Sequence, residues 1–508
     1  MFKKGLGFIL ATALTVMPGC TDGTPLPQTT DAASTSAPVT ENMVIHTEGE
    51  THIALSDSAI TVNGEILSGD TDNAIYGAKD IIYYKSGKDA SYGEGTETDA
   101  HTDEEAGEHV VVHITQPGIY RVSGKLSAGQ LFIDLGDGAK NDADAVVTLI
   151  LDDADITCTV APAILFYNVY ECGDKDVANA TAIVDTAAAG ANVVIADGST
   201  NTVNGAYVAR IYKEGTTDKL HKYDGAFYSK MSMNISGGAK GDGVLNINAA
   251  NEGLNSELHL TVNGGNITIA AQNDGINTNE DNISVTTING GSLTINAGLG
   301  EEGDGIDSNG FLVINGGTVI TSACDRTPDG GIDADRDILI NGGTVMALGN
   351  QNGTVSANSK QNFRQLSVKN AIPANSAVKL SDGDKTLIEF TAIKSGTALV
   401  LSAPALENGK SYTLTVGGET TNYTTGGGFG MGNMQPPIDG NFQRPNDMPQ
   451  GNRFPTVPEG LDEWLNSAEI PEEIRTWIES MRDMASQPSD FGTRSEMPQP
   501  PQDMPQVK

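Results

Sequence analysis

Asn or Asp side chains recur at matching positions of four short segments that each place a Gly before an aliphatic residue. The segments begin at Gly253, Gly275, Gly305 and Gly331. Two residues after the Gly, the first two segments carry Asn255 and Asn277, and the last two carry Asp307 and Asp333. If the segments are adjacent strands ~4.8 Å apart, the two Asp carboxylates repel by about 1 kcal/mol in water and by ~3 kcal/mol at an effective dielectric of 20. Such a column is suited to binding a cation.

More carboxylates lie near this column, in two neighbouring loops that are longer than their counterpart in the preceding repeat. The candidate metal ligands are Glu302, Asp304, Asp307, Asp329, Asp333 and Asp335. Ca²⁺ takes six to eight oxygen ligands, so Ca²⁺ is the expected cofactor. The alternative is that Asn ladders and solvated Asp turns cap the strands without any ion.

A 26-residue repeat is the feature that must position these acids. Asn-Gly-Gly begins at Asn263, Asn289, Asn315 and Asn341, and a degenerate copy begins at Ser236. Each copy lies between two apolar alternations, and the Gly-aliphatic segments supply a third short strand per repeat. Asn and Gly tolerate the left-handed corner conformation. The pattern predicts an all-β chain, a right-handed parallel β-helix with three strands per coil.

Strand alternation also predicts what faces inward and where the domains end. The aliphatic ladder is Leu254, Ile276, Ile306 and Ile332, and the small inward ladder is Ser256, Thr278, Ser308 and Ala334. We expect the β-helix over residues 42–362 and terminal β coils or a cap over 363–425. The Gly, Pro, Met and Gln-rich segment 426–508 is expected to be disordered, with short helices near 458–484.

The N-terminus resembles a bacterial lipoprotein signal. Lys3 and Lys4 precede an apolar run that ends at Met17, and Cys20 follows a small residue at the expected cleavage point. This predicts a signal peptide over residues 1–19, a lipid on Cys20 and a flexible tether over 20–41. The protein would then be secreted and anchored to the outer face of the bacterial cell membrane. A plain secretory signal is the alternative.

Composition limits the other function classes. The chain has 508 residues, and 66 acidic against 30 basic side chains give a net charge of −36, which excludes a nucleic-acid binder. Sixty Gly residues argue against a helical bundle. Apart from Cys20, the cysteines are Cys158, Cys172 and Cys324, so at most one disulfide can form within the mature chain.

The repeats resemble those of secreted carbohydrate-binding β-helix proteins. The matching segments begin at Asp224, Asn273, Gly303 and Asp329, and further matches lie at Val147–Asp152, Ala196–Asn201 and Gly409–Leu414. The resemblance covers roughly residues 50–425. It implies a pectate-lyase-like β-helix that binds Ca²⁺ and plant polysaccharide, including cellulose and acidic sugars, without an established lyase role. It also implies that the Gly-Ile-Asp carboxylates are Ca²⁺ ligands.

Polysaccharide binding is accordingly the expected function, by a chain expected to be monomeric. The candidate sugar-binding residues are Tyr228, Lys230, Asn255, Asn277 and Arg326. Cellulose stacking would need exposed rings such as Tyr228, Tyr83 or Tyr84. Because the chain is so acidic, binding of acidic sugars should vanish when Ca²⁺ is chelated.

Two other functions remain open at the level of sequence. A Ca²⁺-dependent lyase would acidify the C5 proton of a uronate and remove it with a cationic base. The available bases are Lys230, Lys240, Arg326 and Arg336. A structural surface adhesin would have no affinity for glycans at all.

Overall fold

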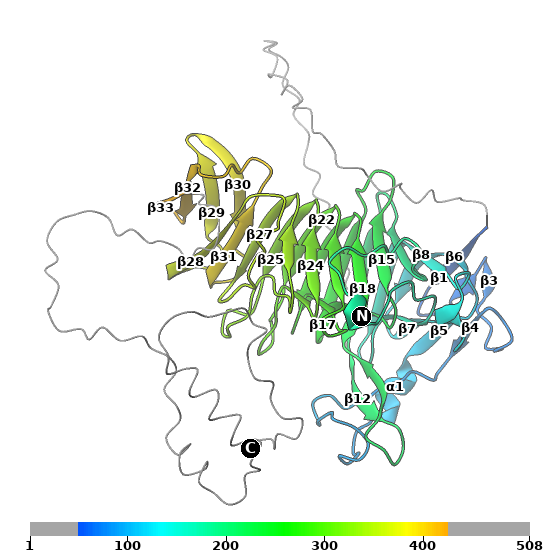
Figure 1. Ribbon diagram of the computed structural model, residues 1–508. Coiled ribbons are helices and arrows are strands. Elements are labelled where there is room, and N and C mark those ends of the chain that lie inside the picture. Colours follow the sequence, from blue (N-terminus) through cyan, green and yellow to red (C-terminus); the bar gives the residue numbers. More distant parts are fainter. Residues whose placement is uncertain (1–48, 425–508) are drawn as a thin grey trace, which may run out of the picture. The chain divides into compact units, whose positions relative to one another are not determined.

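The computed structural model describes residues 49–424 (Figure 1). They form an all-β structure, with one α-helix, α1 (Asp103–Glu108), and 3-10 turns at Ala139–Asn141 and Val177–Asn179. In this part of the chain, no helix is both long and apolar enough to cross a bilayer. The expected signal peptide, Cys20, the tether, and the 426–508 tail with its helices near 458–484 lie outside the described residues.

One sheet of eight strands, which we call the site sheet, carries the Gly-aliphatic segments. Its order is β23-β20-β17-β14-β9-β7-β5-β4. The strands are β4 (Ile75–Ala78), β5 (Val110–Ile114), β7 (Gly129–Asp134), β9 (Ile164–Asn168), β14 (Gly225–Ser229), β17 (Glu252–Ser256), β20 (Ile276–Thr278) and β23 (Ile306–Ser308). All neighbours are parallel except β4, which pairs antiparallel with β5 and covers that edge.

Two further stacks of parallel strands run beside the site sheet. The second stack contains β10 (Ala191–Ile195), β15 (Met233–Gly237), β18 (His259–Val262), β21 (Val285–Ile288), β24 (Phe311–Ile314) and β26 (Ile338–Ile340). The third contains β11 (Thr200–Gly205), β16 (Val244–Ala249), β19 (Asn266–Ala271), β22 (Ser292–Asn296), β25 (Thr318–Ser322) and β27 (Thr344–Gly349). The long strand β8 (Val147–Cys158) pairs with both β10 and β11 and so joins the two stacks.

The strand register follows the 26-residue repeat. Leu260 pairs with Thr286, Thr286 with Leu312 and Leu312 with Ile338, each partner 26 residues further along the chain. The prediction that successive repeats lie side by side as parallel strands is therefore confirmed for these residues.

The inward ladders form the core between the stacks. Leu254, Ile276, Ile306 and Ile332 are fully buried, as are Ser256, Thr278 and Ser308. Burying such an aliphatic side chain contributes about 1.5–3 kcal/mol, so the ladder is a main source of stability. Ala334, at the end of the small ladder, is only partly buried.

The Asn-Gly-Gly corners stack as well. Asn289 donates its side-chain amide to Asn263, Asn315 to Asn289 and Asn341 to Asn315, each at 2.9 Å. The second Gly of each corner has positive φ: Gly265, Gly291, Gly317 and Gly343. A side chain is strained in that conformation, which explains why the repeat keeps Gly there.

Antiparallel strands flank the parallel stacks. At the N-terminal end, β6 (Gly118–Leu126) and β1 (Glu50–Leu55) continue the parallel pairing from β8, and β2 (Thr61–Val62) and β3 (Glu65–Ile66) then add antiparallel to β1. Residues 363–424 contain β28 (Phe363–Ile372), β29 (Ala377–Asp382), β30 (Lys385–Thr391), β31 (Gly396–Ser402), β32 (Ser411–Val416) and β33 (Glu419–Thr424). Their pairings are antiparallel, and β31 also pairs with β27, so it covers the edge of the third stack.

A separate hairpin projects beside the site sheet, built from β12 (Val208–Tyr212) and β13 (Lys219–Tyr223) (Figure 1). Arg210 and Tyr212 on the hairpin both bond the carboxylate of Glu94, at 2.9 and 2.6 Å. These bonds connect the hairpin to the loop that precedes α1. The three described cysteines, Cys158, Cys172 and Cys324, are free thiols, so no disulfide forms among them.

Candidate functional site

The predicted outward column of the site sheet is present. Direct pairing runs through Tyr228, Asn255, Asn277 and Asp307. A β-bridge between Ile306 and Ile332 then carries the register on towards Asp333. Residues that are 22 to 30 positions apart in the sequence thus become neighbours on one face.

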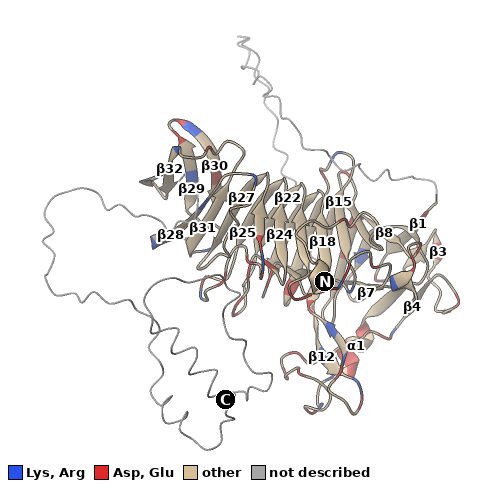
Figure 2. Cartoon of the chain, in the orientation of Figure 1, with Lys and Arg blue, Asp and Glu red and all other residues tan. Residues whose placement is uncertain are grey.

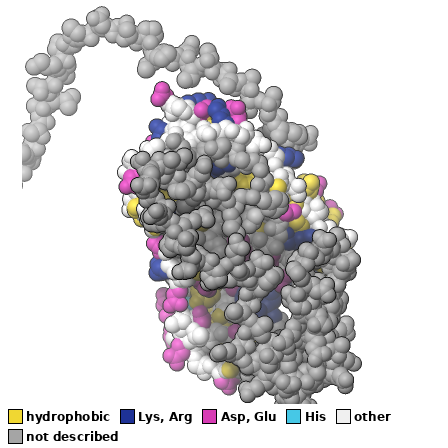
Figure 3. Space-filling view, turned by 60° about the vertical axis from the view of Figure 1, so that its left-hand side comes forward, with side chains coloured by type: hydrophobic (Ala, Val, Ile, Leu, Met, Phe, Trp, Pro, Cys, Tyr) yellow, Lys and Arg dark blue, Asp and Glu magenta, His cyan; other side chains and the backbone are white. Residues whose placement is uncertain are grey.

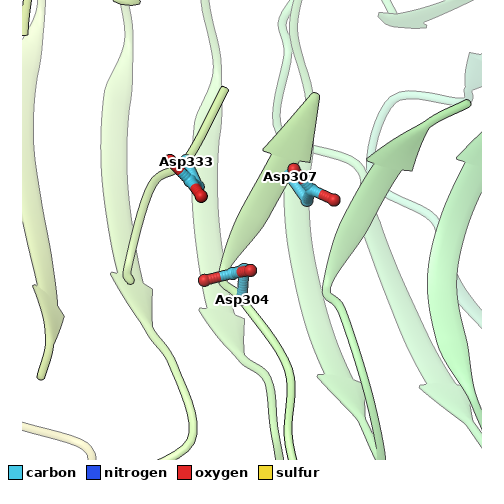
Figure 4. A group of neighbouring side chains, drawn as sticks. All are labelled: Asp304, Asp307 and Asp333. Carbon is cyan, nitrogen blue, oxygen red and sulfur yellow. The ribbon is translucent and has the colours of Figure 1, made fainter. Parts of the chain in front are cut away.

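Three of the six predicted metal ligands form a cluster at the end of this column. Asp304, Asp307 and Asp333 each offer a carboxylate oxygen, and these oxygens all lie within 4.8 Å of one another (Figure 4). Asp307 lies on β23, Asp304 on the loop before it and Asp333 on the next coil. We call these residues the acid triad.

The electrostatics of the acid triad are unfavourable for three bare carboxylates. Burial, followed by neighbouring carboxylates, raises the pKa of Asp304 to about 8 and that of Asp307 to about 6. The pKa of Asp333 is also raised, mainly by burial. Within residues 49–424, no Lys or Arg forms an ion pair with any of the three. A proton or a cation must therefore compensate the charge.

The atoms around the acid triad fit a hard cation. Asn277, the register partner of Asp307, is only 9% exposed, and its buried Oδ1 has no hydrogen-bond partner among the described residues. A buried amide oxygen without a donor is unusual in native structures. Carboxylate and amide oxygens are the ligands that Ca²⁺ prefers, so the donor set is appropriate for Ca²⁺.

Asn255 and Asn277 do not present their amides to solvent, contrary to the prediction that they contact sugar. Both are buried, and their Nδ2 atoms donate to the carboxylate of Glu252, at 3.1 Å for Asn277. Asn277 also donates to Asp274 at 3.4 Å. Burial raises the pKa of Glu252 well above its usual range and that of Asp274 to about 7. The two Asn side chains therefore separate buried acids along the sheet.

The prediction that Tyr228, Tyr83 and Tyr84 are exposed rings for sugar stacking is wrong. All three are buried, Tyr228 to 1% exposure. The ring of Tyr223, on the β13 strand of the hairpin, packs 5.2 Å from that of Tyr228. The hydroxyl of Tyr228 donates to Glu257. Facing out of the sheet does not expose this ring, because the hairpin covers it.

The other predicted ligands lie near the acid triad but are not part of it. Asp329 Oδ2 accepts hydrogen bonds from Gly303 N at 2.7 Å and Thr327 Oγ1 at 2.6 Å, so it ties two loops together. Glu302 and Asp335 are exposed. Arg326 is also exposed and lies 3.5 Å from the carboxylate of its neighbour Asp325. Figure 2 shows acidic residues in the loops below β24 and β25.

A cleft of about 860 Å³ opens beside β9 and β14, in the middle of the site sheet. We call it the lysine cleft. Its lining residues are Asp137, Lys140, Asn141, Tyr167, Asn168, Glu171, Gly173, Lys175, Lys219, Lys230, Met231, Glu257 and Glu280. The Nζ of Lys230 lies 4.2 Å from the ring centroid of Tyr167. Of the predicted sugar-binding residues, only Lys230 lines this cleft.

Comparison with protein families identifies the chain. The family model of carbohydrate-binding domain-containing proteins matches residues 108–173 and 174–411. This match covers more than half of the 508 residues. The chain belongs to this carbohydrate-binding domain family. The acid triad and the lysine cleft both lie inside the matched region.

Two individual proteins resemble this family member over part of its length. A carbohydrate-binding domain-containing protein of Acetivibrio thermocellus is 30% identical over 161 residues, which are 32% of this chain and 45% of that protein. The chain thus matches less than half the length of that relative. A polysaccharide lyase-like protein from C. thermocellum, solved as a gadolinium derivative, shares 20% identity, with a TM-score of 0.36 over 60% of this chain and 91% of that one. A TM-score this low does not establish a common fold.

Sequence reasoning missed most of the carbohydrate-binding domain's lysine cleft. Tyr167, Lys140, Lys175 and Lys219 come from β9, two loops and the hairpin, none of which belongs to the 26-residue repeat. One signal was available, because a chain with only 30 basic residues places four lysines between 213 and 230. That concentration marks the hairpin region as locally basic.

Proposed function

We propose that this member of the carbohydrate-binding domain family binds polysaccharide on the site sheet, with Ca²⁺ held at the acid triad. One observation carries the proposal: Asp304, Asp307 and Asp333 converge, without a basic partner in the described structure, on a face of a carbohydrate-binding domain. Asp307 stands where the earlier repeats carry Asn255 and Asn277, and so brings charge to that face, whereas Asp304 stands where they carry Glu252 and Asp274. Acidic plant polysaccharide, with cellulose as a further ligand, is the proposed partner.

Bound Ca²⁺ would supply positive charge between a −36 protein and an anionic chain. The three Asp carboxylates would hold it, and the amide oxygen of Asn277 is the nearest additional donor in the strand register. Because Ca²⁺ takes six to eight oxygens, ligand positions would remain for water and for sugar oxygens. The cation would therefore serve recognition and relieve the repulsion among the three acids.

We further propose that the stacked coils wind as a right-handed parallel β-helix. The three stacks of parallel strands and the 26-residue register support this winding. Parallel connections are right-handed in nearly all known cases. The site sheet would then form a straight track on which repeating binding groups meet a repeating polymer.

Lipid anchoring at Cys20 stays a proposal from the sequence alone. A secreted lipoprotein would hold the carbohydrate-binding domain at the outer cell surface, next to extracellular polysaccharide. Detergent phase partition of the protein from whole cells tests this idea. Wild type should enter the detergent phase and Cys20→Ala the aqueous phase, whereas equal partition of the two would contradict it.

Calorimetry with chelator-treated protein tests the proposed function. Ca²⁺ should bind wild type, and the double substitution Asp304→Asn with Asp307→Asn should weaken it by about a hundredfold or more. Asp325→Asn, which removes an exposed acid of a nearby loop, is the matched control. Polygalacturonate and cellulose are then titrated with and without Ca²⁺. Absence of Ca²⁺ uptake, or of any glycan binding by the loaded protein, would refute the proposal.

Three of the four candidate bases of a lyase are poorly placed, and the fourth, Arg326, is exposed and lies 3.5 Å from the Asp325 carboxylate. Lys230 is on the β14 coil, three strand spacings or ~14 Å from β23 along the site sheet. Arg336 bonds the backbone oxygen of Asn282 at 3.1 Å, and Lys240 is exposed outside the site sheet. Binding is thus the function that the geometry supports best. Formation of unsaturated product from polygalacturonate, read by absorbance, would reverse this order.

A further inference from the structure

The lysine cleft is a local exception in a strongly acidic protein. Figure 3 shows acidic side chains distributed over the visible face of the described residues. The cleft instead is lined by four lysines and four acids: Lys140, Lys175, Lys219, Lys230, Asp137, Glu171, Glu257 and Glu280. Against 30 basic and 66 acidic residues in the whole chain, this balance is a marked local enrichment in positive charge.

Most of the cleft's acids are already engaged. Glu280 lies 3.4 Å from Lys175, and Glu257 lies 3.6 Å from Lys219. The two carboxylate oxygens of Glu171 accept the backbone N–H groups of Gly173 and Ser232, each at 2.8 Å. Two lysines are thus paired within the cleft, whereas Glu171 is held by backbone N–H groups and not by a lysine.

Lys140 and Lys230 are the remaining lysines of the cleft, and neither forms an ion pair with any described residue. Lys230 is half-buried and rests over the face of Tyr167. His221 lies beside it, and burial together with the Lys230 charge lowers the pKa of that imidazole, so it stays neutral near pH 7. The cleft thus holds two ammonium groups that form no ion pair with a carboxylate of the described residues.

The aromatic rings nearby do not favour a neutral sugar. They form a ladder along the sheet, in which Tyr76 stacks on His113 with centroids 4.4 Å apart, and Phe132 stacks on Tyr167 at 5.7 Å. Rings that stack on one another turn their edges, not their faces, towards a ligand that runs along the sheet. The accessible face of Tyr167 is covered by Lys230. Charge is therefore the recognition element of the cleft.

We propose that the lysine cleft is a second glycan subsite, which binds a sugar carboxylate directly through Lys230 and Lys140 without a bridging cation. The inference rests on the proposed function. It adds that one acidic chain lying across the strands contacts the cleft and the acid triad together. The two sites are three strand spacings apart, ~14 Å along the site sheet, a length that a short oligosaccharide spans.

Calorimetry with oligogalacturonates of two, four and six sugars tests this subsite on the full chain, with Ca²⁺ or with chelator. With chelator, weak binding of the oligogalacturonates should remain, and it should fall by about tenfold or more in Lys230→Met. Lys230→Arg should retain it, and Lys240→Met, an exposed lysine outside the cleft, should leave it unchanged. Cello-oligosaccharides of equal length should not compete.

With Ca²⁺, the longer oligosaccharides should gain affinity over the disaccharide in wild type but lose that gain in Lys230→Met. Equal affinities of Lys230→Met and Lys240→Met under chelation would overturn the subsite. Its failure is distinguishable from failure of the proposed function. If only the subsite fails, Ca²⁺-loaded protein still binds polygalacturonate through the acid triad. If the proposed function fails, Ca²⁺-loaded wild type binds no glycan.

Discussion

The middle and one end of the site sheet have the same backbone and opposite chemistry. Around β9 and β14, in the middle, the outward positions and their neighbours are aromatic or basic: Tyr167, Tyr228 and Lys230. At the β23 end, the column that begins at Tyr228 continues through Asn277 and Asp307 towards Asp333. The parallel register is unbroken between them, so the fold supplies regularly spaced positions and each coil determines what they carry.

The hairpin accounts for much of this difference. It lies over the middle of the sheet, where Tyr223 covers Tyr228 and Lys219 reaches the cleft. The hairpin thus converts an outward residue into a core residue. At the acid triad the outward positions carry carboxylates, which are only partly buried.

The largest effect is expected in the shared core. Ile306→Ala should lower the free energy of unfolding by about 2–5 kcal/mol, because it leaves a cavity in the fully buried inward ladder. Urea denaturation of the metal-free protein measures it. Ile306→Val is the matched control, with a loss of about 0.5–1.5 kcal/mol. Equal losses in the two variants would show that the inward ladder is not close-packed next to the acid triad.

A pH series should reveal the raised pKa values of the acid triad. In the metal-free protein, Asp304 and Asp307 have pKa values of about 8 and 6, both raised from an ordinary value of 3.8. Between pH 4 and 8 these two carboxyls therefore hold more protons in the folded than in the unfolded state, and their contribution to stability falls as pH rises. Thermal melts with chelator should show this decrease. A flat profile over that range would contradict the raised pKa values.

The substitution Asp307→Asn should reduce this pH dependence and raise the melting temperature of the metal-free protein at pH 8. It removes one of three mutually repelling carboxylates. The same variant should gain less stability than wild type when Ca²⁺ is added. Asp325→Asn serves as the control, and a lower melting temperature of Asp307→Asn without Ca²⁺ would argue against repulsion in the triad.

A smaller effect is expected where the hairpin covers the site sheet. Tyr228→Phe removes the hydroxyl that donates to Glu257 and should cost about 1–2 kcal/mol of stability. Affinity for polygalacturonate should stay unchanged, because the ring is buried under the hairpin. Denaturation and calorimetry on the same preparation measure both quantities. A selective loss of affinity would restore Tyr228 as a sugar contact.

The smallest effect is expected for Arg326→Ala. This exposed side chain stays a predicted sugar contact, and surface charges contribute about 0.2–1 kcal/mol. Affinity for polygalacturonate with Ca²⁺ should fall by up to about fivefold. Asp325→Ala should instead preserve or improve binding. A loss as large as that of the acid-triad variants would shift the centre of the site to this loop.

The sequence predicted the parts of the fold that repeat. Asn263 and its equivalents every 26 residues specified the parallel register, because a constant coil length pairs each residue with the one 26 positions further on. The alternation of side chains along each strand then specified the inward ladder. Three of the six proposed ligands converge for the same reason. Handedness, Ca²⁺ binding and lipid anchoring remain proposals.

The parts that do not repeat could not be predicted in the same way. Alternation places Tyr228, Asn255 and Asn277 on the outward face, yet exposure depends on what covers that face. The hairpin covers Tyr228, and the buried acid Glu252 binds the amides of Asn255 and Asn277. Strand alternation predicts neither the position of the hairpin nor the burial of Glu252. The lysine cleft was missed because long-range packing of loops, not periodicity, brings Lys140 and Lys230 together.

The hydrogen-bonded Asn ladder makes each coil an interchangeable unit. Residues 263–288 run from one Asn-Gly-Gly to the residue before the next, and a copy inserted after Ile288 would lie between Asn263 and Asn289, which both offer amide partners. A duplicate of this unit could therefore be inserted without a new kind of contact. In the engineered chain, the two subsites would be further apart by one coil. The shortest oligosaccharide able to engage both would be longer by the same distance.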